Sequence, residues 1–443
     1  MGRIKELDGL RAIAVSGVLA AHFVPLHAWV ANVFGLGRFG VDLFFVISGF
    51  LITRILMCLR HEKAPFVAFY SRRTLRIFPP YYLALALILL LALAHGERID
   101  YREVARYAVF LSSLTPSLIK VAISRLFCSI PPASQAGYRA GPYSLLQFKT
   151  CLGIYWSLSV EELFYLIWAP IILKGSRRTV LFCSLAPFFV CPLLRGLAHT
   201  TPHIAESIGF VFRFDSLAAG GCVALLFWGV ENDYFEARVV ERALKWAMVL
   251  SSLALLALIT LCGVWRGVDV RTTFAFSVFG FSFLAILCAS VVGACASWSG
   301  GQGFPSSMLR SKSMVYLGMV SYTVYLIHLP AYVVVQQVMS RFFGWNAFAA
   351  RQGLIALSGM VATAATIALA ALSWKYIEAP ILRAKDKLFP LQAAGPSTLP
   401  QNEVGRFGWQ GSPPPARQIS EDTGTTPDVD TKRPRPGTVP ISN

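Results

Sequence analysis

The feature that most constrains this chain is a series of apolar blocks, each long enough to form a membrane-crossing helix. A helix needs about 20 mostly apolar residues to cross a hydrocarbon core of about 30 Å. We therefore predict an all-α, polytopic membrane helix bundle with about ten transmembrane helices. The blocks lie near Ala12–Ala31, Gly40–Leu59, Phe78–Ala94, Tyr155–Leu173, Thr179–Ala198, Ile208–Val230, Leu244–Val264, Thr273–Ala296, Met314–Met339 and Gly353–Leu372.

A weaker block at Val104–Ile119 is an eleventh span if it crosses the membrane. It contains Ser112, Ser113 and Pro116, which favour a re-entrant or surface helix instead. Only 14% of the residues are charged, against about 25% in typical soluble domains, so a soluble protein is excluded. A transmembrane strand barrel is also excluded, because the blocks are too long and do not alternate in polarity.

The basic residues indicate how the chain is oriented. The formal net charge is +17, but basic residues are enriched in cytoplasmic loops of membrane proteins, so topology explains this excess better than nucleic-acid binding. The connection after the second block contains Arg60, Lys63, Arg72, Arg73 and Arg76. We predict a multi-pass protein of the inner (plasma) membrane with cytoplasmic N- and C-termini, which requires an even number of spans.

The composition changes near the C-terminal end of the chain. The residues from Pro390 onward include ten of the 25 prolines and few large apolar side chains. A segment of this kind cannot bury enough apolar surface to fold. We predict a membrane domain over residues 1–388 and a disordered, proline-rich tail over residues 389–443.

Two of the nine cysteines stand apart from the others. Cys128 and Cys151 lie in or at the edge of a polar loop, residues 120–149, that the topology places outside. A disulfide between them would persist there if the compartment is oxidising. The remaining cysteines are scattered without the spacing of metal ligands, so no metal site is predicted.

The first block contains an unusual pair of polar side chains. In "LDGLRAIAVSGVLAAHF", Arg11 and His22 are eleven residues apart, which is about three helical turns and about 16 Å along the axis. Both therefore lie on one face, with His22 near mid-bilayer if Arg11 lies at the interface. An ionisable side chain at that depth faces the protein interior or a water-filled cavity. Asp8 precedes the block and is expected to cap the helix.

Further polar groups interrupt the other blocks. Each also has a structural explanation, since arginines can act as topology determinants and carboxylates can pair with them. An intramembrane charge costs at least about 2.5 kcal/mol, however, so this many together indicate a functional polar cavity. These residues are Asp42, Arg72, Arg73, Arg76, Glu161, Glu162, Arg213, Asp215, His328 and Glu378.

The motifs, taken in order, resemble acyltransferase family 3, the integral membrane O-acyltransferases that modify cell-surface glycans, lipid-linked sugars, Nod factors and macrolides. The resemblance covers roughly residues 4–383. It departs from the family at Leu163, where glutamine is common, and in lacking a soluble esterase-like domain after the last span. The motifs are "LDGLRAIAV…H", "GVDLFFVISGFLIT", "RRTLRIFPPYY", "WSLSVEELFYL", "RFDSLAAG", "SYTVYLIHLP" and "YIEAP".

The resemblance implies an enzyme that moves an acyl group, usually acetyl, from cytoplasmic acyl-CoA to a hydroxyl of a cell-envelope glycan or related acceptor. Arginine forks suit the phosphates of CoA, which assigns Arg11, Arg72, Arg73 and Arg76 to the donor. His22 is the candidate base, acting directly or through an acyl-imidazole. The carboxylates expected to orient it or to balance Arg213 are Glu161, Glu162 and Asp215. Substrate-binding or supporting roles fall to Asp42, Arg213, His328 and Glu378.

A transporter is the main alternative. Buried Arg, Asp, Glu and His side chains also occur in proton-coupled transporters, and a polysaccharide exporter is a related possibility. The sequence does not contain two matching halves with interrupted helices. The cytoplasmic arginine cluster also has no evident use in transport. We therefore favour the O-acyltransferase.

Overall fold

The protein is described by a computed structural model. It covers residues 4–23, 39–97, 99, 101–110, 151–201, 209–263, 273–297, 304–344, 348 and 351–389. Across these residues the regular structure is helical and contains no strand.

Several helices are preceded or followed directly by a short 3-10 or π turn. The elements are α1 (Lys5–Phe23), α3 (Gly40–Leu59), α4 (Pro65–Ala94), α5 (Tyr101–Ala108), η3 (Leu152–Tyr155), α8 (Trp156–Lys174), α9 (Arg177–Leu185), α10 (Pro187–Thr200), η4 (Gly209–Arg213), α12 (Phe214–Glu231), α13 (Ala237–Leu261), η7 (Phe276–Gly280), α14 (Phe281–Ser297), α15 (Phe304–Leu309), α16 (Lys312–Phe343), α18 (Gln352–Ser373), η8 (Trp374–Glu378) and α19 (Ala379–Leu388).

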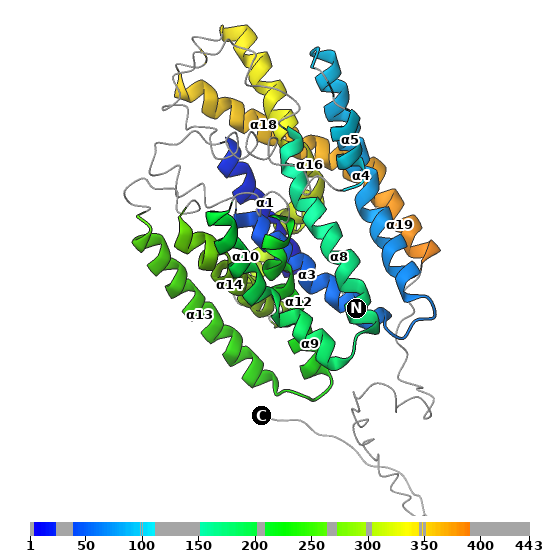
Figure 1. Ribbon diagram of the computed structural model, residues 1–443. Helices are drawn as coiled ribbons and strands as arrows, with labels where there is room; N and C mark the ends of the chain where they lie inside the picture. The colour runs from blue at the N-terminus through cyan, green and yellow to red at the C-terminus, as the bar shows by residue number, and fades with distance from the viewer. Residues whose placement is uncertain are drawn as a thin grey trace, which may run out of the picture. The chain divides into compact units, whose positions relative to one another are not determined.

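Nine helical segments within the described residues are long and apolar enough to cross a membrane, and they coincide with nine of the ten blocks predicted from the sequence. The predicted polytopic helix bundle is confirmed. Apolar side chains remain exposed at its edge, for example Trp246, Leu250 and Leu253 on α13, which lies at the margin of the bundle (Figure 1). Such a surface is suited to contact lipid tails.

Helix α1 differs from the segment predicted for it. It begins at Lys5 rather than Ala12, so its first two turns include Glu6, Asp8 and Arg11. It is not among the nine apolar segments. The expectation that Asp8 caps the helix is wrong, because Asp8 lies inside it and its carboxylate pairs with Arg11 at 3.2 Å. This ion pair offsets the charges of Asp8 and Arg11, which is compatible with a helix that begins at Lys5, before the apolar block.

Helix α4 also begins earlier than predicted. The sequence placed the third span at Phe78–Ala94, but the helix starts at Pro65 and continues through Pro79 and Pro80. Proline at the first helical position is favourable because its missing N–H is not needed there. The arginines before Pro79 therefore lie on a rigid helix rather than in a loop.

Three sequence predictions concern residues outside the described ones. Helix α5 covers only the start of the weak block Val104–Ile119, and residues 111–150 are not described. Cys128 falls in that gap, so the predicted Cys128–Cys151 bridge remains a prediction. The tail from Pro390 likewise lies outside the described residues.

Glycines allow two helix pairs to approach backbone to backbone. A Cβ at Gly49 or Gly220 would overlap the backbone of the facing helix, because α3 and α12 pack directly against each other (Figure 1). Helix α1 packs on α16 in the same way, with Gly318 against the carbonyl of Asp8. Small residues commonly mediate such contacts in membranes, where helices gain little from hydrophobic burial.

The glycine contacts generate a stability prediction. We expect Gly220→Ala to lower the free energy of unfolding by about 1–3 kcal/mol, the usual cost of overpacking. Its added methyl group would meet the backbone of Val46. Gly196→Ala is the matched control, since its Cβ would meet side-chain atoms no closer than 3.4 Å and alanine is the better helix former. Thermal unfolding in detergent would measure both, and equal stability of the two variants would contradict this packing account.

Candidate functional site

A cavity of about 110 Å³ opens between α1, α3, α4, α8 and α16. Its polar walls include Arg11 from α1, Arg73 and Arg76 from α4, and Glu161 from α8. The structure therefore brings together three of the four predicted anion-binding arginines with one predicted carboxylate. Three guanidinium groups on one small cavity give it a strongly positive surface.

Arg73 is held in place by protein groups. One of its terminal nitrogens lies 3.7 Å from a carboxylate oxygen of Glu161, and it also donates to the hydroxyl of Tyr165. The guanidinium carbon lies 4.1 Å from the centroid of the Tyr165 ring, and the Tyr165 hydroxyl is also hydrogen-bonded to Ser48. The Nε of Arg73 is buried and has no partner among the described residues. One terminal nitrogen of Arg73 is thus engaged within the protein.

Arg76, one turn further along α4, is in a different situation. It lines the cavity and is exposed. No described residue accepts a hydrogen bond from it or forms an ion pair with it. Arg11 shares the cavity and pairs with Asp8. An exposed guanidinium that forms no ion pair, beside two others, has the chemistry to bind an anion with several oxygens, such as a phosphate.

The two histidines predicted from the sequence lie side by side, although 306 residues separate His22 on α1 from His328 on α16. Their ring centroids are 5.1 Å apart, and the rings are tilted by 55°. The Nδ1 of His22 lies 2.8 Å from the carbonyl of Val18, and that of His328 lies 2.7 Å from the carbonyl of Tyr325. A carbonyl only accepts, so each neutral ring carries its proton on Nδ1 and presents a lone pair at Nε2.

A layer of aromatic side chains connects the cavity with the histidines. Tyr325 lines the cavity, and its ring centroid lies 5.7 Å from that of His328. Phe44 also lines the cavity and packs against the apolar cluster to which Phe23 belongs. Neither histidine is among the described wall residues of the cavity. The arginine cavity and the histidine pair are therefore neighbours, with Tyr325 in contact with both.

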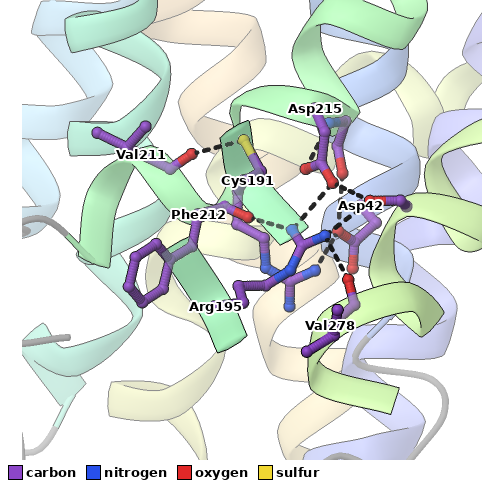
Figure 2. Close-up of polar contacts among 10 residues, drawn as sticks. Asp42, Cys191, Arg195, Val211, Phe212, Asp215 and Val278 are labelled. Atoms are coloured by element: carbon purple, nitrogen blue, oxygen red, sulfur yellow. Dashed lines mark hydrogen bonds and ion pairs between the residues drawn. The ribbon is translucent and has the colours of Figure 1, made fainter. Parts of the chain in front are cut away.

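A second polar cluster lies deep among α3, α10, α12 and α14 (Figure 2). Arg195 donates to the carboxylate of Asp215 at 2.9 Å, and both groups are buried. Arg213 donates to the carboxylate of Asp42 at 2.7 Å. Ser216 joins the two pairs, since its N–H donates to Asp215 and its hydroxyl donates to Asp42.

The charges of this cluster balance, with two guanidinium groups and two carboxylates. Arg195 is further fixed by the carbonyls of Phe212 and Val278 and by the hydroxyl of Ser282. Such a closed arrangement joins helices from four parts of the chain. We interpret it as a structural lock, because buried charge pairs held by several further hydrogen bonds favour one geometry. The Nε of Arg195 is the exception, since it is buried without a partner among the described residues.

The lock corrects one sequence-based expectation. Asp215 was expected to orient the imidazole or to balance Arg213, but it is paired with Arg195, and Asp42 balances Arg213. Sequence reasoning missed Arg195 altogether. It is an isolated charge within the apolar block Thr179–Ala198, and that pattern alone would have predicted a buried partner.

The remaining predicted residues lie outside the cavity wall. Arg72 donates to the carbonyl of Phe389 at the end of α19. Glu162 forms no hydrogen bond or ion pair with a described residue. Glu378 is buried in the π turn before α19 and accepts hydrogen bonds from the hydroxyls of Thr323 at 2.7 Å and Ser373 at 3.0 Å. Glu378 thus ties the last helix to α16.

Comparisons with known proteins relate the chain to acyltransferases. A family model described as an acyltransferase domain matches residues 4–375. Peptidoglycan O-acetyltransferase OatA of Listeria monocytogenes is 25% identical over 393 residues, which cover 85% of this chain and 56% of that protein. Putative peptidoglycan O-acetyltransferase YrhL of Bacillus subtilis is 26% identical over 390 residues, covering 85% of this chain and 55% of that protein.

A third relative, O-acetyltransferase OatA of Staphylococcus aureus, is 25% identical over 407 residues, covering 86% of this chain and 58% of that protein. The chain thus spans a little over half the length of these curated relatives. No solved structure matches the chain significantly.

The buried lock generates a second stability prediction. We expect Asp215→Leu to destabilise the protein by about 3–5 kcal/mol, because it leaves the charge of Arg195 buried without a carboxylate. Adding Arg195→Met removes that charge and should recover part of the loss. Thermal unfolding and yield in detergent would test this, and a double variant less stable than the single one would show that the pair is not the source of the effect.

Proposed function

This chain belongs to the acyltransferase domain family, and we propose that it acts as a membrane O-acyltransferase. In this proposal an acyl group, acetyl by analogy with the named relatives, moves from acyl-CoA to a hydroxyl of a cell-envelope glycan or a related acceptor. The observation that carries the proposal is that an anion-binding cavity and a pair of histidines lie close together. An arginine-lined cavity suited to phosphates lies one aromatic layer away from a pair of histidines.

The donor would bind in the arginine cavity. CoA carries phosphates that need several hydrogen-bond donors with positive charge, and guanidinium groups meet both needs. Arg76 is exposed there and forms no ion pair with a described carboxylate, and Arg11 lines the same cavity. The basic connection before α4 supports a cytoplasmic position for this end of the cavity, which is the side on which acyl-CoA is made available.

The two arginines of α4 would have different tasks. Arg73 already contacts Glu161 and Tyr165, so we assign it to shaping the wall and setting the charge of the cavity. Arg76 would make the direct phosphate contact. Arg72, which donates to the carbonyl of Phe389, would contribute to the donor site only through its charge.

His22 would act as the general base. A hydroxyl is a weak nucleophile at neutral pH, and histidine is the commonest side chain to take its proton. The hydrogen bond from Nδ1 of His22 to the carbonyl of Val18 makes Nε2 the basic nitrogen of the neutral ring. In direct transfer, Nε2 takes the hydroxyl proton while the oxygen attacks the thioester carbonyl. The C–S bond then breaks, and the departing thiolate receives the proton to give free CoA.

A second route passes through a covalent intermediate. Nε2 of His22 would attack the thioester itself, release CoA and hold the acyl group as an acyl-imidazole until the acceptor hydroxyl takes it. Both routes use the same nitrogen. The acceptor is a glycan by analogy with the relatives named as peptidoglycan O-acetyltransferases, and peptidoglycan is the first acceptor to test.

Transport remains the competing function. A proton-coupled transporter would use buried ionisable groups, but the described carboxylates with arginine partners form fixed pairs such as Asp215–Arg195. Purified protein incubated with radiolabelled acetyl-CoA separates the two functions. Release of CoA or acyl transfer supports the enzyme, whereas uptake into vesicles without turnover supports the transporter.

The donor site yields a prediction about affinity. Arg76→Ala should weaken acyl-CoA binding by roughly ten- to a hundredfold, because a hydrogen bond to a charged group contributes about 1.5–3 kcal/mol. Arg76→Lys should be intermediate, since it keeps the charge but loses the planar fork. Calorimetry on purified protein would measure both. Arg54→Ala, which breaks an ion pair with Glu231 outside the cavity, is the control. Unchanged affinity in Arg76→Ala would remove the phosphate assignment.

The proposed base yields a prediction about turnover. His22→Ala should abolish acyl transfer while acyl-CoA still binds, because the arginine cavity does not include His22. His95→Ala removes an exposed histidine at the end of α4 and should retain normal turnover. Transfer of labelled acetyl groups and calorimetric binding, measured on the same preparations, separate the two effects. Near-normal turnover in His22→Ala would refute the assignment of the base.

A further inference from the structure

The walls of the arginine cavity differ between its two ends, and one end is polar. Arg73 of α4 lies 3.7 Å from a carboxylate oxygen of Glu161 on α8. It also donates to the hydroxyl of Tyr165, which is hydrogen-bonded to Ser48 of α3. These contacts mark the level along the bundle at which the polar groups of α3, α4 and α8 meet.

The other end of the cavity is aromatic. Phe44 lies four residues before Ser48 on α3, and its ring centroid is 6.3 Å from that of Tyr325 on α16. Ser157 lies four residues before Glu161 on α8, and its hydroxyl is 2.8 Å from that of Tyr325. Four residues span about 6 Å along a helix axis. These residues all line the cavity, so both helices reach the aromatic end about one turn before the polar end.

This arrangement matches the two chemically different ends of an acyl-CoA molecule. The phosphates suit guanidinium groups, and Arg76 is exposed, so phosphates can bind it without leaving water. The acyl chain beyond the thioester is apolar, and its transfer from water to an apolar surface is favourable. The aromatic end is therefore the part of the wall that suits the acyl group.

Phe44 separates the aromatic end from an apolar cluster beyond it. The Phe44 side chain is partly buried and packs against the buried cluster to which Phe23 of α1 belongs. Tyr325 is held more firmly, since its hydroxyl is hydrogen-bonded to Ser157 and to the carbonyl of Ile154. The Phe44 ring has no polar atom, so it can be shortened without leaving a polar group unsatisfied.

We propose that the acyl group of the donor lies against Phe44, and that this ring limits the donor to short acyl groups such as acetyl. This inference rests on the proposed function and narrows its donor class. A longer chain would have to displace an aromatic side chain that packs against the buried cluster, and displacing closely packed side chains is unfavourable. Phe44 is thus a specificity-determining residue and takes no part in bond making.

The test compares acetyl-CoA with butanoyl-CoA, whose acyl chain is longer by two methylene groups. Calorimetry on purified full-length protein gives both affinities, and each is expressed relative to free CoA so that the contribution of the phosphates cancels. We expect the wild-type protein to bind butanoyl-CoA at least about tenfold more weakly than acetyl-CoA, because one methylene group can change binding in an apolar pocket by roughly ten- to two-hundredfold.

Two variants of Phe44 shorten the ring in steps. Phe44→Leu and Phe44→Ala open increasing space toward the apolar cluster. The ratio of the butanoyl-CoA affinity to the acetyl-CoA affinity should rise to about one in Phe44→Leu. In Phe44→Ala it should favour butanoyl-CoA by roughly tenfold, since the added methylene groups then become buried. Thermal unfolding shows which variants are folded, and ratios are compared only between folded proteins.

Two control variants separate this effect from others. Phe39→Leu shortens another partly buried phenylalanine, directly before α3, whose ring lies 5.7 Å from that of Phe276 and outside the cavity wall. It should leave the affinity ratio at the wild-type value. Arg76→Ala should weaken the binding of both acyl-CoAs by the same factor, because the phosphates are common to them.

Three outcomes would overturn the inference. They are equal affinities of wild-type protein for the two acyl-CoAs, an unchanged ratio in a folded Phe44 variant, or the same shift in Phe39→Leu as in Phe44→Leu. The wild-type measurement alone can overturn it, so the test does not depend on the folding of a variant.

The proposed function is scored separately, as O-acetyl content of envelope glycans in cells that express wild-type or His22→Ala protein. If that content depends on His22 while the two acyl-CoAs are not distinguished, the proposed function stands and the role of Phe44 falls. If the affinity ratios behave as expected but no acetyl group is transferred, the acyl site stands and the proposed enzyme activity falls. If the protein binds none of these ligands, both proposals fail.

Discussion

The cost of placing charge inside an apolar bundle governs most of this structure. Deep in the bundle, Arg195 and Arg213 each have a carboxylate partner, and further hydrogen bonds complete the lock. Around the cavity, Arg73 is similarly engaged by Glu161. Arg76 is the contrast, because it lines the cavity and forms no ion pair with a described carboxylate. The bundle compensates its structural charges internally and leaves positive charge where an anionic donor would bind.

Close helix contacts determine where the histidines meet. Helices α1 and α16 touch at two levels, with Gly318 against the backbone of Asp8 and His328 against His22. The missing side chain of Gly318 lets the two backbones approach, and the approach continues along both helices to the imidazoles. A pair of ring nitrogens is thus positioned by a contact that carries no chemistry itself.

The arginine cavity and the neighbouring histidine pair suggest how one membrane protein would bind a charged donor and a hydroxyl-bearing acceptor. A charged donor suits the arginine cavity, and a hydroxyl acceptor suits the histidine pair. Tyr325 lines the cavity and contacts His328, and its hydroxyl is hydrogen-bonded to Ser157 and to the carbonyl of Ile154. In the proposed reaction only the acyl group would pass this layer, so phosphates would stay on one side and the glycan on the other.

The sequence by itself determined the class of fold, because blocks of apolar residues of membrane-spanning length permit few other structures. It also indicated which polar residues matter, since charges and imidazoles in such blocks are costly, and it supplied the family resemblance. It did not determine partners. That Asp215 pairs with Arg195 rather than Arg213, that α1 begins at Lys5, and that His328 lies against His22 were decided by tertiary structure. The physical reason is that helical periodicity places residues on a face, whereas contacts between helices depend on close packing of segments far apart in the chain.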